Sequence, residues 1–168
     1  MTIQRVCDTL RAQLFGQDFE YGFVLDGRTY KPSRDAGFDR EFDRQLRMNY
    51  RIQQPAVTLR YKTGTCMDAV LVMKSTLEAF SIPCKIWLQY DRGKNKPHTI
   101  VTFTAQTKTV YLELTPQSSK PWYGRECLYP DEAAFLEEFA RNGYEMYDVT
   151  GKVFAGQRPS VLLSVVNG

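Results

Sequence analysis

The segment from residue 62 to residue 87, KTGTCMDAVLVMKSTLEAFSIPCKIW, constrains the fold more than any other part of the chain. Thr65, followed three residues later by Asp68, has the pattern of a capping box, which marks the first turn of a helix. Pro83 cannot continue a helix and therefore limits its end. Between these signals, an apolar stripe at helical spacing predicts a buried face formed by Val70, Met73, Leu77 and Phe80.

Three strands are expected after this helix, because the chain becomes rich in β-branched and aromatic residues separated by polar, turn-like segments. They are KIWLQY (85–90), HTIVTF (98–103) and TVYLEL (109–114). We predict that the last two form a hairpin. A helix followed by hairpin strands indicates an α+β fold, in which the central helix packs against an antiparallel sheet.

The rest of the chain adds elements at both ends of this core. Apolar residues at helical spacing predict an amphipathic helix in residues 1–16, formed by Ile3, Val6, Leu10 and Leu14. A second, highly charged surface helix is expected in residues 33–51, and a third in residues 130–143, with Asp131 near its start. The apolar tail, residues 153–166, is predicted to form a last strand. With 168 residues, 43% of them hydrophobic, we expect residues 1–168 to form a single domain.

Charge and hydropathy exclude several classes of partner. Lys and Arg number 22 against 19 Asp and Glu, so a net charge of +3 gives no reason to expect nucleic acid or an anionic membrane. We see no signal peptide and no segment long enough to cross a bilayer, and therefore expect a cytoplasmic protein. The four cysteines contain no C-x-x-C pair, which argues against a zinc or disulfide framework and favours reduced, independent thiols.

Cys66 differs from the other cysteines in its position at the predicted start of a helix. Unpaired N–H groups and the partial positive charge at a helix N-terminus stabilise a thiolate and lower the pKa of its thiol. The same amides can hold an oxyanion. Cys7 and Cys84 lie in apolar stretches and are expected in the core, whereas Cys127 is expected to be an incidental thiol in a loop.

A thiolate nucleophile needs a base, and the chain has a single histidine, His98, at the start of a predicted strand. If the hairpin closes symmetrically around residues 106–107, His98 lies opposite Thr115 and Ile100 lies opposite Glu113. His98 and Glu113 are then diagonal neighbours on one face, roughly 7–8 Å apart between backbones, which their side chains can bridge. A shift of one residue in this register turns Glu113 away from the histidine.

These segments together resemble the core of the transglutaminase-like superfamily of papain-type thiol enzymes. The resemblance covers about residues 60–120: a cysteine opening a helix, a turn resembling GIPAR, a strand, a histidine opening a second strand, and an acid near a strand end that resembles DPT. It implies Cys66 as nucleophile, His98 as general base and acid, and Glu113 as third member. The family usually has Asp where this chain has Glu113, but either carboxylate can accept a hydrogen bond from Nδ1–H of the histidine.

The resemblance implies a cysteine-dependent acyl-transfer enzyme that acts on a peptide or protein substrate through a thioester on Cys66. Water resolving the thioester makes a peptidase or amidase, and an amine acceptor makes a transglutaminase; the catalytic residues do not separate the two. No cofactor or metal is required, and a metal site built from the cysteines and His98 is disfavoured by their spacing. The alternative from another class is a non-catalytic module that uses the same cleft to bind a protein partner.

Residues that complete an oxyanion hole or a substrate groove are less well defined by the sequence. Tyr61, Gln53 and Gln54 are upstream polar candidates for the oxyanion hole. Trp122 and Tyr123, just after the third predicted strand, either line a substrate groove or pack over the core.

Overall fold

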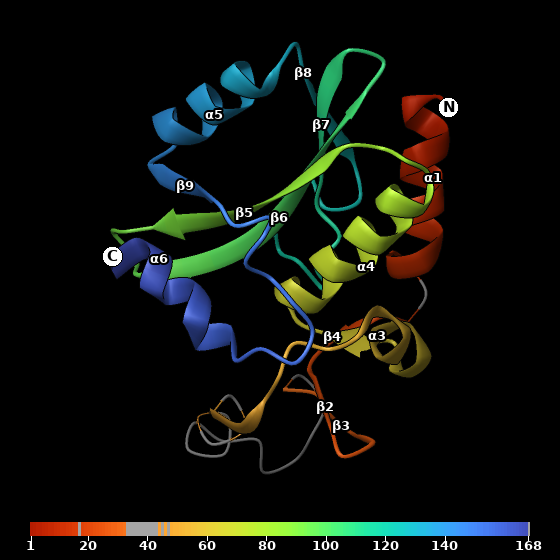
Figure 1. Ribbon diagram of the computed structural model, residues 1–168, viewed down its shortest axis with the longest axis vertical. Helices are drawn as coiled ribbons and strands as arrows, with labels where there is room; N and C mark the ends of the chain where they lie inside the picture. The colour runs from red at the N-terminus through yellow and green to blue at the C-terminus, as the bar shows by residue number, and fades with distance from the viewer. Residues whose placement is uncertain (17, 33–43, 45, 47, 168) are drawn as a thin grey trace.

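The computed structural model describes residues 1–16, 18–32, 44, 46 and 48–167. A five-stranded antiparallel sheet in the order β8-β7-β6-β5-β9 forms the centre, and helices lie on both of its faces (Figure 1). Its strands are β5 (Cys84–Asp91), β6 (Lys96–Ala105), β7 (Lys108–Leu112), β8 (Glu126–Tyr129) and β9 (Tyr144–Asp148). The predicted α+β class with an antiparallel sheet is therefore confirmed.

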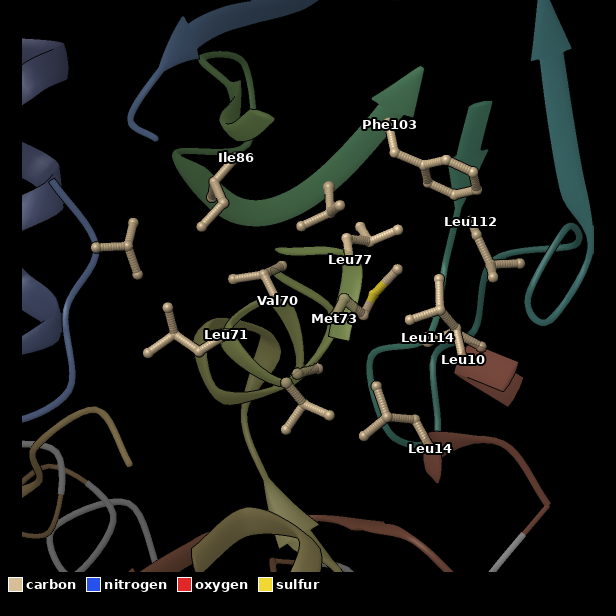
Figure 2. Close-up of a cluster of buried hydrophobic side chains, with 14 of the residues drawn as sticks. Leu10, Leu14, Val70, Leu71, Met73, Leu77, Ile86, Phe103, Leu112 and Leu114 are labelled. Carbon is tan, nitrogen blue, oxygen red and sulfur yellow. The ribbon is translucent and has the colours of Figure 1, made fainter. Parts of the chain in front are cut away.

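Two helices cover one face of the sheet. Figure 1 shows α4 (Cys66–Ala79) and α1 (Ile3–Leu14) on this side, where α4 packs directly on β5 and β6. Val70, Met73 and Leu77 of the predicted stripe pack against side chains of α1 and the sheet in the main hydrophobic core (Figure 2). The prediction that Phe80 is also buried is wrong: it is the C-cap after the last turn of α4 and is 40% exposed. Burial of a Leu or Val side chain contributes about 1.5–3 kcal/mol, so this layer holds α4 firmly in place. The core includes Leu10, Leu14, Val70, Met73, Leu77, Ile86, Phe103 and Leu112.

The opposite face carries a smaller, mainly aromatic core under α5 (Glu132–Arg141). Phe135 and Phe139 of this helix pack on side chains of β5, β6 and β7, among them Trp87 and Tyr111. Asp131 caps α5 by accepting from the backbone N–H of Ala134 at 2.8 Å, as its place in the sequence predicts. The helices predicted in residues 1–16 and 130–143 are both confirmed.

Short elements below the sheet complete the described fold. They are β1 (Glu20–Tyr21), β2 (Phe23–Leu25), β3 (Arg28–Tyr30), α3 (Pro55–Tyr61) and β4 (Thr63–Gly64). β1 pairs with β4 in parallel, and β2 pairs with β3. Most of the helix predicted in residues 33–51 lies outside the described residues. Within this range, Leu46 and Tyr50 are buried against Phe23.

The β6–β7 hairpin has the predicted register. Thr102 pairs with Tyr111 and Phe103 with Val110, and the turn consists of Gln106 and Thr107. Both turn residues have left-handed backbone conformations, with φ of 48° and 63°, as a two-residue turn that follows the twist of its strands requires.

Two predictions about the second half of the chain are wrong. The apolar tail forms a short 3₁₀ helix, η1 (Pro159–Leu162), followed by α6 (Leu163–Asn167), and the last strand of the sheet is β9, which precedes it. Pro159 lacks the N–H that a sheet ladder needs, and Leu162 reaches the core from the 3₁₀ turn instead. Cys127 lies on β8 and not in a loop. Cys7 is buried in the core and Cys84 packs against it, as predicted.

Candidate active site

Cys66 is the first residue of α4. The preceding residue, Thr65, is the N-cap, with the extended backbone that caps a helix (φ −93°, ψ −178°). Cys66 therefore stands where the N–H groups of the first helical turn have no partner within the helix and where the helix dipole is positive. This position favours the thiolate form of its side chain.

The buried carboxylate of Asp68 fixes the start of α4. It accepts hydrogen bonds from the backbone N–H of Thr65 at 2.7 Å and from the Thr65 hydroxyl at 3.0 Å, as expected for a capping residue. It also accepts from the backbone N–H of Gln53 at 2.8 Å and from the hydroxyl of Tyr50. Asp68 thus joins the start of α4 to the chain segment that precedes α3.

Replacing Asp68 with alanine is expected to lower the free energy of unfolding by about 3 kcal/mol, since a helix cap is lost and buried donors lose their acceptor. Urea unfolding measures the difference. Asp8→Ala, which changes an exposed aspartate on α1, is the matched control and should stay within about 0.5 kcal/mol of wild type. Equal stability of the two variants would show that Asp68 does not anchor the helix.

His98 lies in β6 and contacts the carboxylate of Glu113 through Nε2. The two carboxylate oxygens are 3.2 Å and 3.1 Å from this nitrogen. The expectation that Nδ1–H of the histidine donates to the carboxylate is therefore wrong. The Cys66 thiol and His98 line the same cavity, and the interaction between them changes the pKa of both groups.

Glu113 directly follows the last residue of β7 and is only 1% exposed. Besides the imidazole, it accepts hydrogen bonds from the hydroxyl of Tyr111 at 2.5 Å and from the backbone N–H of Thr115 at 3.3 Å. Tyr111 in turn accepts from the indole N–H of Trp122 at 3.2 Å. A chain of hydrogen bonds thus runs from Trp122 to the carboxylate and holds it against His98.

The electrostatics of the three groups favour a charged state. Burial alone would raise the pKa of the Cys66 thiol, but the interaction with His98, together with hydrogen bonds from Thr99, outweighs it and lowers this pKa. Burial would lower the pKa of His98, but its hydrogen bonds to Cys66 and Glu113 raise it to about 10. The pKa of Glu113 is lowered, because contact with His98 and the hydrogen bonds from Tyr111 and Thr115 together outweigh the effect of burial. All three shifts therefore favour the thiolate, imidazolium and carboxylate forms.

The other three thiols have the opposite tendency. Burial raises the pKa of Cys7 to about 11, and it also raises the pKa values of Cys84 and Cys127. Of the four cysteines, Cys66 is therefore the one with the properties of a nucleophile.

Two cavities meet at this site, and both are lined by Tyr21 and His98. The first, of about 300 Å³, also includes Cys66 and is mainly apolar; we call it the apolar cavity. Its walls include Phe23, Met67, Leu88 and Leu162. The second, of about 570 Å³, does not include Cys66 and is lined by polar and basic residues; we call it the cationic cavity.

The structure does not bring the other candidates to Cys66. Tyr61 lies at a separate cavity beside Gly27, and Gln54 is the exposed N-cap of α3. The side chain of Gln53 is occupied, because it donates to Thr58 at 2.8 Å and accepts from the backbone of Val24 at 3.0 Å. Trp122 lines neither cavity at the site and packs in the aromatic core.

Three residues at the site were not anticipated from the sequence. Tyr111 could have been found, because it stands two residues before Glu113 on a predicted strand and therefore shares its face. Gln89 pairs across the sheet with His98, which depends on the register of β5 and β6. Tyr21 reaches the site through the pairing of β1 with β4, two strands too short to give a sequence pattern.

Within the described ranges, no three His, Cys, Asp or Glu side chains are grouped so that they could hold a metal ion. None of the helices in the described part of the chain is long and apolar enough to cross a membrane.

No protein-family model matches the chain, and neither a curated protein nor a solved structure gives a match.

Proposed function

We propose that the protein is a cysteine-dependent acyl-transfer enzyme that acts on peptide or amide bonds and has a papain/transglutaminase-like core. One observation carries this proposal. The thiol at the N-terminus of α4 shares a cavity with His98, whose Nε2 faces a carboxylate that is 1% exposed. A nucleophile, a base and an orienting group in this order form the arrangement that nucleophilic catalysis by cysteine needs.

In the proposed reaction, the thiolate of Cys66 attacks the carbonyl carbon of an amide, and the C=O electron pair moves to oxygen. The backbone N–H of Cys66, in the first turn of α4, is a donor for this oxyanion. As the tetrahedral intermediate collapses, the C–N bond breaks and His98 gives its proton to the leaving amine. A thioester remains on Cys66, and a water or an amine that loses a proton to His98 then releases the acyl group.

Glu113 acts through the histidine and is a positioning residue. Its charge stabilises the imidazolium, and its two contacts with Nε2 hold the ring, which leaves Nδ1 for proton exchange. This division of the two ring nitrogens allows His98 to exchange a proton with the thiol and the substrate without losing its orientation.

The experiment that tests this proposal is acetylation by p-nitrophenyl acetate. We expect a burst of p-nitrophenol of about one equivalent per protein and an acetyl group on Cys66, located by peptide mass mapping and removed by hydroxylamine. Cys66→Ser should lose the burst, whereas Cys127→Ser should keep it. Acetylation of all four cysteines at similar rates, or of none, would contradict the proposal and favour the non-catalytic binding module.

A further inference from the structure

The cationic cavity is built on one face of three neighbouring strands. Gln89 pairs with His98 across β5 and β6, and Asp91 pairs with both Lys96 of β6 and Tyr144 of β9. Because directly paired residues project to the same side of a sheet, all five side chains share one face. The loop of residues 115–120, which follows β7 and Glu113, forms a wall of the same cavity.

Positive charge predominates in this cavity. Lys94, Lys96 and Lys120 line it together with a single carboxylate, Asp91, which lies 3.8 Å from Lys94. Within the described part of the chain, neither Lys96 nor Lys120 has a carboxylate within 4 Å. Lys120 is half-buried and held in place, because its ammonium donates to the hydroxyl of Tyr144 at 3.4 Å. The cavity therefore offers two unneutralised ammonium groups beside the imidazolium of His98.

A buried amide supplies a second, independent indication of a ligand. Gln89 is 2% exposed and lines the cavity next to His98, yet its Oε1 has no hydrogen-bond partner among the described residues. Buried side-chain carbonyls nearly always accept a hydrogen bond. A peptide N–H that enters the cavity beside His98 is a partner of the required kind.

The placement of the catalytic pair separates the two halves of a substrate. Of the two cavities, Cys66 lines the apolar one, so the acyl group that it carries as a thioester lies there. His98 lines both cavities and must exchange a proton with the amine. The amine that leaves, or that arrives as acceptor, therefore lies on the side of the cationic cavity.

Resting on the proposed function, we propose that the cationic cavity binds the amine half of the acyl-transfer reaction and that this half is a peptide segment with a carboxylate. Lys96 and Lys120 bind the carboxylate, and Gln89 accepts from a backbone N–H of the segment. With such an acceptor, the amine nitrogen forms a bond to the thioester carbonyl carbon and the C–S bond breaks. The proton from the amine goes to His98, and the thiolate of Cys66 is restored.

The test uses Cys66 acetylated by p-nitrophenyl acetate and two acceptors that differ by one charge, alanyl-glutamate amide and alanyl-glutamine amide. Their α-amino groups are the same, so a difference in acetylated product reports the carboxylate alone. We expect the glutamate dipeptide to be acetylated about five-fold faster or more, the effect of one partly screened ion pair. The double variant Lys96→Gln/Lys120→Gln should bring the ratio to about one.

A matched control removes two positive charges elsewhere. Lys108 and Lys152 are exposed and line neither cavity, so Lys108→Gln/Lys152→Gln should keep the wild-type preference. Equal acetylation of the two dipeptides by a normally acetylated wild-type enzyme would overturn the assignment of this cavity and leave the proposed function intact. Failure of Cys66 to become acetylated would instead refute the proposed function.

A strict hydrolase would give no acetylated dipeptide, so binding is also measured directly. In a chemical-shift titration with the same dipeptides, the glutamate dipeptide should bind about five-fold more tightly or more and shift the side-chain amide of Gln89. The Lys96→Gln/Lys120→Gln variant should lose this difference. Binding that does not depend on the carboxylate, or that leaves Gln89 unchanged, would overturn the inference.

Discussion

Replacing His98 with alanine is expected to slow alkylation of Cys66 by iodoacetamide at pH 6 by about ten-fold or more. Without the imidazolium, burial is the main remaining influence and raises the pKa of the thiol. A thiol with a pKa of 8.5 or higher has at most about 0.3% thiolate at pH 6. The more basic thiolate is intrinsically more reactive, with a Brønsted slope of about 0.4–0.5, and this recovers only part of the loss.

The measurement is the alkylation rate of each cysteine between pH 5 and pH 10, located by peptide mass mapping. In the wild type, Cys66 should stay reactive below the range in which an ordinary thiol titrates, whereas Cys84 and Cys127, whose pKa values are raised, should react only at alkaline pH. These two thiols are internal controls, because His98→Ala should leave their rates unchanged. An unchanged profile of Cys66 in the variant would show that no thiolate–imidazolium pair exists.

The part of this site that the sequence predicts depends on short-range patterns. The start of α4 follows from Thr65 and Asp68, and helical periodicity identifies its buried stripe except at the exposed C-cap, Phe80. The register that brings His98 to Glu113 follows from the symmetry of a hairpin with only two turn residues. Each of these features is determined by a few residues that are close together in the sequence, so the sequence pattern is enough to predict it.

The walls of the two cavities depend on contacts between distant parts of the chain. Leu162 and Leu163 close the apolar cavity from a tail that was expected to be a strand. Tyr21 reaches both cavities through a two-residue parallel pairing of β1 with β4. Contacts between residues so far apart in the chain leave no periodic pattern in the sequence. In addition, a short apolar segment has much the same pattern whether it forms a strand or a buried helix.

The ring nitrogen of His98 that contacts Glu113 is a detail that the sequence does not predict. The sequence predicts that Glu113 lies within reach of the imidazole, and this is correct. Whether Nε2 or Nδ1 faces the carboxylate depends on the side-chain rotamer of His98 and on the position of α4 beside β6. Both are properties of tertiary packing, and the strand pattern alone does not determine them.

Replacing Glu113 with glutamine is expected to narrow the pH range of acetylation from both sides and to lower its maximum by about 10–100-fold. Loss of an orienting carboxylate costs up to about 10⁴-fold in serine enzymes, and less is expected here because the thiolate forms before the reaction. The glutamine keeps an acceptor for Nε2–H but lacks the charge. The imidazolium is therefore less stable, so the raised pKa of His98 should fall and the lowered pKa of Cys66 should rise.

The sign of each change follows from the active ion pair. In the proposed reaction, acetylation needs the thiolate together with the imidazolium, so its acid limb should report the pKa of Cys66 and its alkaline limb that of His98. In Glu113→Gln the acid limb should move to higher pH and the alkaline limb to lower pH. Glu132→Gln, which changes a surface glutamate paired with Lys85, is the matched control and should keep both limbs. If the Glu113→Gln profile is lower at every pH but neither limb moves, Glu113 supports the fold and does not act on the charge of His98. Loss of folded protein lowers the rate at every pH without moving either limb.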